Sequence, residues 1–372
     1  MASHVYYDLV IRNFASQPKQ HLRFSETRNS ALVPKASDYL LSIIRFQVDT
    51  TSLPVLFCDI QKEQSNPNLT PYCITLNYKD KFGTDITTTP TYVVWEPQHK
   101  DSIVPSAPSK NTTGYQDFNS DYYYCYTYQH FIELINKCFV EARTKLVSLV
   151  PLLSTVETPF MSWDVSTNKA SIYLRSPYYE SGLSPNVTPR ITIYFNQPLM
   201  TLFNSFPYLR YDSNVKTQQY EIICNSFFGI NMVELDQNTN RFIKVSQEYS
   251  TTAQWSPVSS LIFTSNTLPV RANQLSNPIV LDDGKVVQFQ DNTSNVYQNI
   301  ITDMCVDENI YKPNVLYIPS TYRYIELIGN QDIRNVELSL YWRDKLGYLR
   351  EFYLDAGSSA SVKLMFQAKN IT

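Results

Sequence analysis

Short segments in which hydrophobic and polar positions alternate dominate the first hundred residues. In the opening segment, Leu9 and Ile11 alternate with Val10 and Arg12, as expected of a half-buried strand. The apolar run 39–49 is rich in β-branched residues and predicts a strand covered on both faces, near the middle of a sheet. Similar patterns predict strands over residues 22–28, 53–60, 72–78 and 88–95.

One segment, 126–147, has the hydrophobic period of an amphipathic helix. Its apolar side recurs every three or four residues, at Phe131, Ile135, Cys138, Ala142 and Leu146. Its polar side carries Glu133, Lys137, Glu141 and Lys145, which form favourable i,i+4 pairs of Glu and Lys. We expect a surface helix that lies on a sheet.

The rest of the chain again predicts strands. Residues 97–119 carry little apolar periodicity and indicate a long ordered loop or a junction. A hairpin turn is expected at 166–169, a short helix within 199–206 and a joining loop at 343–347. Strands are expected over residues 160–165, 170–174, 190–195, 220–224, 241–248, 259–264, 285–289, 296–305, 322–327, 336–342, 348–354 and 361–366.

Many short strands with one long helix favour an all-β fold, an antiparallel jelly-roll sandwich. The pattern leaves two arrangements open: one roll with a large insertion, or two rolls in tandem.

Composition argues against nucleotide chemistry. The chain has 8 glycines beside 28 tyrosines and 21 prolines, and it contains no GxGxxG, GxxxxGK[ST] or GxSxG motif. Its net charge of −3 comes from 31 basic and 34 acidic residues, with no basic run that could act as a nucleic-acid arm. No secretory signal or apolar stretch long enough to span a membrane is present, so we expect a folded, soluble protein.

The titratable residues form no recognisable catalytic or metal-binding constellation. The histidines His4, His21, His99 and His130 lack metal-ligand spacing. The set Asp117, Asn119 and Asp121 resembles half a calcium loop, but Tyr122 replaces the required Gly, so we expect no metal and no cofactor. Six scattered cysteines without a CxxC pair are expected to be buried free thiols: Cys58, Cys73, Cys125, Cys138, Cys224 and Cys305.

A tyrosine cluster precedes the helix. It consists of Tyr122, Tyr123, Tyr124, Tyr126 and Tyr128. Exposed tyrosines supply large contact area at small entropic cost, and these five could form a subunit interface or stack on sugar rings. The alternative is that they pack beneath the helix.

The two ends of the chain resemble capsid proteins of small eukaryotic DNA viruses. The resemblance is carried by the segments 9–13, 24–28, 37–46, 341–347 and 361–366, and it is closest to the penton or minor capsid proteins of virophages and polinton-like viruses. It implies a jelly-roll core built from residues 1–96 and 310–372, with 97–309 as a solvent-facing insertion or second β domain.

The same resemblance implies a structural protein of the virion rather than an enzyme. It predicts a pentamer that closes the five-fold vertices of an icosahedral capsid and contacts the major capsid protein, without direct nucleic-acid binding. Assembly would occur inside the host cell. Two alternatives remain: a major capsid protein with two jelly rolls, or a carbohydrate-binding or spike module for host attachment. A hydrolase on a β-sandwich is a third choice, and the lack of a His/Asp/Glu constellation argues against it.

Overall fold

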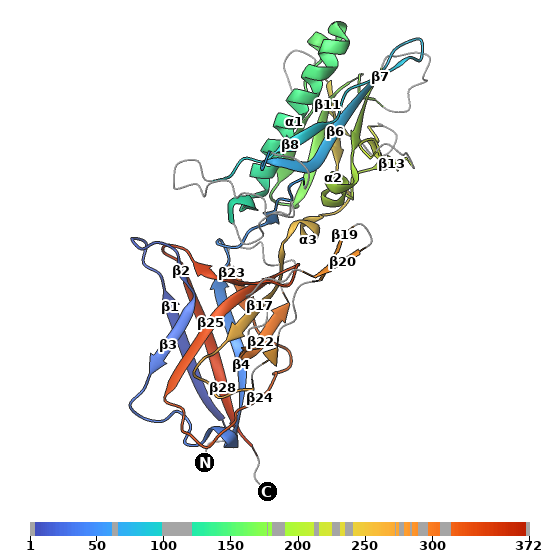
Figure 1. Cartoon of the computed structure of the whole chain (residues 1–372). Helices are drawn as coiled ribbons and strands as arrows, with labels where there is room; N and C mark the ends of the chain where they lie inside the picture. The colour runs from blue at the N-terminus through green and yellow to red at the C-terminus, as the bar shows by residue number, and fades with distance from the viewer. Residues whose placement is uncertain are drawn as a thin grey trace. The chain divides into compact units, whose positions relative to one another are not determined.

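The chain divides into two compact units, shown in the computed structural model of Figure 1. Unit 1 comprises Met1–Pro54 and Pro257–Thr372, and unit 2 comprises Val55–Ser256. The structure describes residues 4–61, 66–98, 121–176, 178–180, 190–211, 216–224, 231–234, 241–271, 273–274, 279–282, 285–288, 297–305 and 314–369. Most of the predicted loop 97–119 lies outside these residues.

Unit 1 is built from two five-stranded antiparallel sheets (Figure 1). The first has the order β1-β28-β4-β23, with β24 also paired to β4. Its strands are β1 (His4–Arg12), β28 (Ser359–Ala368), β4 (Tyr39–Asp49), β23 (Asn314–Tyr317) and β24 (Ile325–Glu326). The second has the order β22-β17-β25-β26, with β3 also paired to β25. Its strands are β22 (Ile300–Cys305), β17 (Val258–Thr264), β25 (Asn335–Asp344), β26 (Leu349–Glu351) and β3 (Arg23–Thr27).

This strand order is that of a jelly roll, because strands that are neighbours in a sheet are distant in sequence. The chain visits the two sheets in turn, from β1 to β3 and back to β4, and later from β23 to β25 and β28. Unit 2 is inserted between β4 and β17. Short ladders supplement unit 1: β2 (Gln20–His21) with β27 (Tyr353–Leu354), β18 (Asn273–Gln274) with β21 (Tyr297–Gln298), and β19 (Ile279–Asp282) with β20 (Lys285–Gln288).

The core of the roll is formed by the inward positions of both sheets. Phe46 of β4 meets Phe263 of β17 edge to face, with 4.8 Å between ring centroids. Outward positions alternate with these, as in β1, where Leu9 is buried and Val10 is exposed. The predicted alternation of the opening strand is therefore confirmed.

A buried carboxylate holds the hairpin between β25 and β26. Asp344 Oδ1 accepts hydrogen bonds from the backbone N–H groups of Leu346 and Tyr348, at 3.0 and 2.9 Å, and its Oδ2 pairs with Arg350 Nε at 3.0 Å. Gly347 adopts a φ of 97° in this turn, a conformation that side chains disfavour. The joining loop predicted at 343–347 is thus confirmed.

The described residues of unit 2 form two larger antiparallel sheets, the two-stranded ladder of β5 and β9, and three α-helices (Figure 1). The six-stranded sheet consists of β13 (Tyr208–Arg210), β14 (Tyr220–Ile222), β12 (Arg190–Phe195), β6 (Leu69–Lys79), β7 (Asp85–Thr87) and β8 (Thr91–Val94). The four-stranded sheet consists of β10 (Phe160–Asp164), β11 (Lys169–Arg175), β16 (Arg241–Ser246) and β15 (Asn231–Glu234). The helices are α1 (Tyr128–Leu149), α2 (Gln197–Leu202) and α3 (Thr252–Trp255). Smaller elements of unit 2 are β5 (Leu56–Phe57), β9 (Tyr124–Cys125) and the 3₁₀ turns η2 (Asp121–Tyr123) and η3 (Pro151–Thr155). The 3₁₀ turn η1 (Ala36–Asp38) belongs to unit 1.

Helix α1 is the predicted amphipathic helix, displaced by two residues. Its apolar side is buried, and Phe131 meets Tyr72 of β6 with 5.5 Å between ring centroids. Its other side is exposed and carries an ion pair between Lys145 and Glu141 at 2.9 Å. The prediction of a surface helix that lies on a sheet is confirmed.

An aromatic cluster around Trp255 joins the helices and sheets of unit 2. The buried Trp255 ring contacts Tyr128, Phe131 and Phe203, at centroid distances of 5.3, 5.4 and 5.1 Å. Its Nε1 donates a 2.8 Å hydrogen bond to the carbonyl oxygen of Leu202. The cluster therefore satisfies the polar atom of the indole while burying a large apolar surface.

The unit boundaries differ from the expected ones. The sequence-based division at 96 and 310 assigned β6 and β8 to the roll and β17 and β22 to the insertion, whereas the structure has the reverse. The reason is that strands of both units share the same alternating pattern, so periodicity does not reveal which sheet a strand joins. The jelly-roll order occurs once among the described strands, which favours one roll with an insertion over two rolls.

We predict that Trp255→Ala destabilises unit 2 by about 3–5 kcal/mol, because the substitution opens a cavity and removes several aromatic contacts. Urea unfolding followed by tryptophan fluorescence and far-UV circular dichroism measures the effect. Phe82→Ala is the control, because Phe82 is 82% exposed and should change the free energy of unfolding by less than about 0.5 kcal/mol. If both variants changed the free energy of unfolding equally, the Trp255 cluster would not have a central role in stability.

We predict that one thiol per chain reacts rapidly in the native protein. Five cysteines are buried and Cys305 is exposed. Burial raises the pKa of Cys73 and of Cys125 to about 12, so almost none of their nucleophilic thiolate form exists at pH 8. Titration with a chromogenic disulfide reagent should count one fast thiol in the native protein and six after denaturation. Cys305→Ser should abolish the fast reaction, and its persistence would contradict the assignment.

Candidate functional site

The predicted tyrosine cluster lies in unit 2, and four of its five members are buried. Tyr126 is the partly exposed member. The Tyr122 hydroxyl donates to Asn68 Oδ1 at 3.0 Å, and the Tyr123 hydroxyl donates to the carbonyl oxygen of Pro67 at 2.8 Å. The Tyr128 ring stacks on Trp163, with centroids 4.4 Å apart. Tyr124 is buried beside Phe57. These rings therefore contribute to the packing of unit 2, and an interface role for them remains a prediction.

The described histidines are separated from one another: His4 stacks on Tyr6, and the other two lie close to backbone oxygens. His21 Nε2 lies 3.0 Å from the Leu340 carbonyl oxygen, and His130 Nε2 lies 2.7 Å from that of Glu96. His99, Asp117 and Asn119 lie outside the described residues. Among the described residues, no group of three or more His, Cys, Asp or Glu side chains is close enough to hold a metal ion.

Exposed apolar side chains mark two opposite edges of the β1-β28-β4-β23 sheet of unit 1. We call the side chains of Val10 and Phe14 the β1 edge; they are 75% and 68% exposed. We call those of Leu316 and Ile318 the β23 edge; they are 58% and 64% exposed. Each set lies on, or just after, the outermost described strand of the sheet. The two edges differ in sequence and position, so the roll presents two distinct apolar surfaces.

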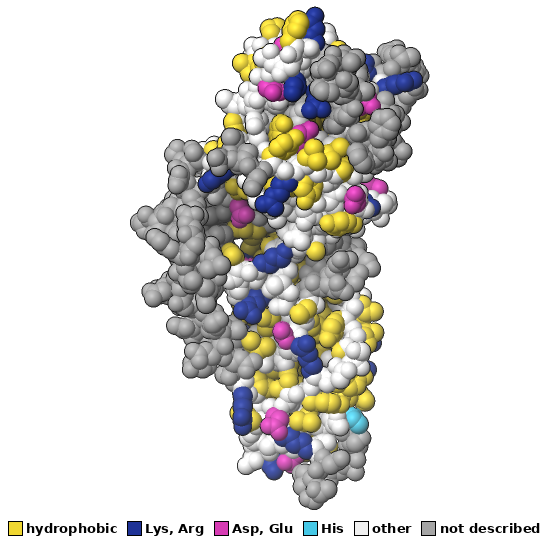
Figure 2. Space-filling model, turned by 90° about the vertical axis from the view of Figure 1, so that its right-hand side faces the viewer, with side chains coloured by type: hydrophobic (Ala, Val, Ile, Leu, Met, Phe, Trp, Pro, Cys, Tyr) yellow, Lys and Arg dark blue, Asp and Glu magenta, His cyan; other side chains and the backbone are white. Residues whose placement is uncertain are grey.

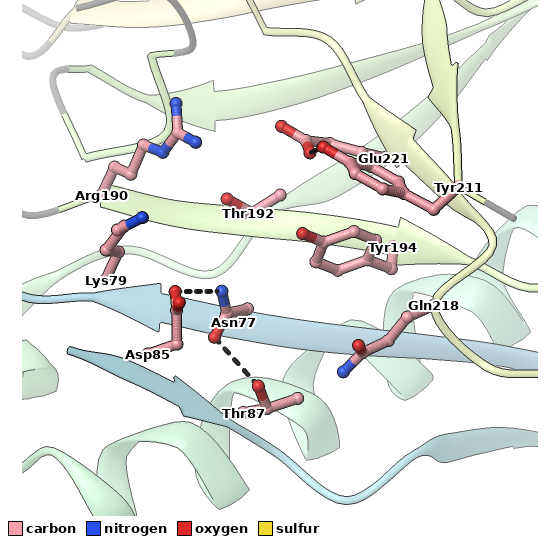
Figure 3. A pocket seen from close by; sticks show the side chains of 10 residues that line it. All are labelled: Asn77, Lys79, Asp85, Thr87, Arg190, Thr192, Tyr194, Tyr211, Gln218 and Glu221. Atoms are coloured by element: carbon pink, nitrogen blue, oxygen red, sulfur yellow. Dashed lines mark hydrogen bonds between the residues drawn. The ribbon is translucent and has the colours of Figure 1, made fainter. Parts of the chain in front are cut away.

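A polar basin of about 350 Å³ lies on one face of the six-stranded sheet in unit 2 (Figure 3). Its lining follows from the period of two in each strand, because alternate residues point to the same face. From β6 come Asn77 and Lys79, from β12 come Arg190, Thr192 and Tyr194, and from β14 comes Glu221. The intervening residues, such as Leu76, Ile191 and Ile193, are buried on the other face.

Two cations lie side by side at one end of the basin (Figure 3). Arg190 and Lys79 are direct neighbours in the antiparallel register of β12 and β6. The Arg190 Nε is buried without a hydrogen-bond partner among the described residues. Like charges opposite each other in a sheet, and a buried unpaired donor, each cost stability.

The two acids of the basin are engaged by neighbouring side chains. Tyr211 donates a 2.5 Å hydrogen bond to Glu221 Oε2, and Asp85 Oδ1 accepts from Asn77 Nδ2 at 3.0 Å. The bond to Glu221, together with burial, raises the pKa of Tyr211 to about 12, which keeps its ring neutral. Burial likewise raises the pKa of Tyr194. The basin therefore combines neutral tyrosine hydroxyls, amides and two cations whose side chains have no hydrogen-bond or ion-pair partner among the described residues.

The charges on the described surface are mixed. On the face shown in Figure 2, Lys and Arg side chains are scattered among Asp, Glu and hydrophobic side chains rather than gathered into one patch. Nucleic acids bind proteins largely through concentrated positive charge. Among the described residues, no helix is long and apolar enough to cross a membrane.

Neither the sheet edges nor the basin was singled out from the sequence. The basin residues come from two parts of the chain, 77–87 and 190–221, which are more than a hundred positions apart. A weak signal was present in the polar alternation of Arg190, Thr192 and Tyr194, because a half-buried strand with these residues must turn them to one face. Deducing the shared basin also requires the strand order, which the pattern does not contain.

A jelly roll in which β28 lies between β1 and β4 has the fold that viral coat proteins share with lectins, and this class of β-sandwich is the one that the strand order defines. A comparison with protein families identifies the family within this class: residues 5–368 match the model of the Sputnik minor capsid protein V18/19 family. The chain belongs to this family. It is therefore a structural protein of a virion capsid, and the predicted resemblance to virophage minor capsid proteins is confirmed.

Two curated relatives come from the Sputnik virophage. The chain is 26% identical to Structural protein V19 over 220 residues, which cover 56% of this chain and 94% of the relative. It is 27% identical to Uncharacterized protein V18 over 143 residues, which cover 37% of this chain and 81% of the relative.

Two solved structures share the fold over nearly the whole chain. A chain in the cryo-EM structure of the Sputnik virophage superposes with a TM-score of 0.83 at 23% identity and covers 100% of this chain and 99% of its own. The mavirus penton protein superposes with a TM-score of 0.62 at 15% identity, and the match covers 98% of this chain and 99% of the penton chain. Both support the predicted jelly-roll class.

Proposed function

We propose that the protein forms a homopentamer that closes the five-fold vertices of an icosahedral capsid and contacts the major capsid protein around it. The observation that carries the proposal is the pair of exposed apolar edges on opposite sides of one sheet in unit 1. The number five is supported by the likeness of the fold to the mavirus penton protein.

Ring closure requires two different surfaces on each subunit. A head-to-tail contact joins one surface of a subunit to another surface of the next, and a fixed rotation then closes the ring. The β1 edge and the β23 edge meet this requirement, because they lie at the two ends of the strand order β1-β28-β4-β23. Burial of their apolar side chains would supply the favourable free energy of association.

The role is one of contact and not of catalysis. The described cysteines other than Cys305 are buried, and the described histidines His21 and His130 lie close to backbone oxygens. Catalysis requires several titratable side chains that act together, whereas these groups are isolated from one another. Broad surfaces with apolar side chains are suited to contacts between subunits.

We predict that the purified protein in the micromolar range reaches a species of five times its chain mass of 43.1 kDa. Val10→Asp and Leu316→Asp should each weaken this assembly, because a charge in an apolar contact costs several kcal/mol unless it is paired. Native mass spectrometry and light scattering measure the masses. A stable trimer, or a monomer that persists at high concentration, would contradict the proposal.

Mixing the two single variants tests the head-to-tail geometry directly. Val10→Asp retains an intact β23 edge and Leu316→Asp retains an intact β1 edge, so one productive contact can form and the mixture should stop at a heterodimer. Phe82→Asp, which alters an exposed turn of unit 2, is the control and should assemble like the unaltered protein. If the mixture gave no heterodimer while each variant remained folded, the two edges would not be partners.

A further inference from the structure

We propose that the polar basin of unit 2 binds a saccharide that carries a carboxylate, such as a uronic or sialic acid residue, with Arg190 and Lys79 holding the carboxylate. The proposal does not depend on the pentamer, because every residue of the basin comes from unit 2.

The size and lining of the basin suit a small saccharide. A volume of about 350 Å³ lies at the lower end of the range of ligand pockets. Its lining offers amide and hydroxyl groups of Asn77, Thr87 and Thr192, which can donate to and accept from sugar hydroxyls. The Tyr194 ring adds a partly exposed aromatic surface on which the apolar face of a sugar ring can rest.

The cation pair selects for a carboxylate. Arg190 and Lys79 are cross-strand neighbours, and neither side chain makes an ion pair or hydrogen bond with another described residue. The planar guanidinium of arginine binds carboxylates through two parallel hydrogen bonds, and an adjacent ammonium strengthens the attraction. A bound carboxylate would also relieve the repulsion between the two cations.

Neither acid of the basin forms an ion pair with these cations. Asp85 lies in register with Lys79, at the same end of the basin (Figure 3), and its Oδ1 accepts from Asn77 at 3.0 Å. Glu221 is buried and accepts the hydrogen bond of Tyr211. Asp85 offsets part of the charge of Lys79, and the cation side chains keep their donors for a ligand.

The test is a titration of the purified protein with sialyllactose and, separately, with a glucuronic acid disaccharide. Isothermal titration calorimetry and saturation-transfer NMR measure the binding. Lactose and inorganic phosphate are the comparison probes. We expect one of the two acidic saccharides to bind at least tenfold more tightly than lactose, with an affinity that falls as salt increases. Equal binding of lactose, equal binding of phosphate, or no binding of either acidic saccharide at millimolar concentration would overturn the proposal.

Variants assign the binding to the basin. Arg190→Gln should lower the affinity for the acidic saccharide at least tenfold, and Lys79→Gln should act in the same direction. Arg45→Gln changes the net charge equally at an exposed position of β4 in unit 1 and should leave the affinity unchanged.

Thermal unfolding distinguishes a binding role from a structural one. Because Arg190 has an unpaired buried donor and faces Lys79, Arg190→Gln should leave the melting temperature equal or higher. Loss of affinity with retained stability supports the proposal. Full affinity in both Arg190→Gln and Lys79→Gln would overturn it.

Discussion

The roll depends on the position of β28 between β1 and β4. Val362 of β28 lies in register with Leu9 on one side and with Phe46 on the other, and all three side chains are buried in the core. Residues from the two ends of the chain are thus joined in one sheet, and the fold is encoded in contacts between distant segments. Such non-local pairing carries a large loop-closure cost, which the buried apolar surface of both sheets must offset.

Much of this architecture is visible in the sequence, because each strand must bury one face. The alternation of Leu9 and Val10 predicted the orientation of β1, and the apolar run 39–49 predicted β4 at its observed bounds. Several short elements departed from the prediction, among them β23 and β5. Strand β23 was missed because its four residues carry too short a pattern, and the strand expected over 53–60 is reduced to β5, because its other buried residues lie in irregular segments.

The candidate sites could be predicted from the sequence less well than the fold. The tyrosines were conspicuous by their clustering, but burial depends on what surrounds a ring, and Tyr123 and Tyr128 are surrounded by Trp95, Phe57 and Trp163 from distant segments. Conversely, no motif or spacing in the sequence marks Arg190 and Lys79 as a pair. Their proximity arises from the register of β12 against β6, which is a property of the folded sheet and not of either segment.

The two units also differ in how they can form during synthesis. Unit 2 is one continuous stretch, Val55–Ser256, and can fold as soon as it has emerged from the ribosome. The roll must wait for β28 (Ser359–Ala368), because this strand is made long after β1 and β4 and lies between them. Unit 2 can therefore be folded while the first sheet of the roll still lacks its central strand, so the inserted unit is finished before the unit that encloses it in sequence.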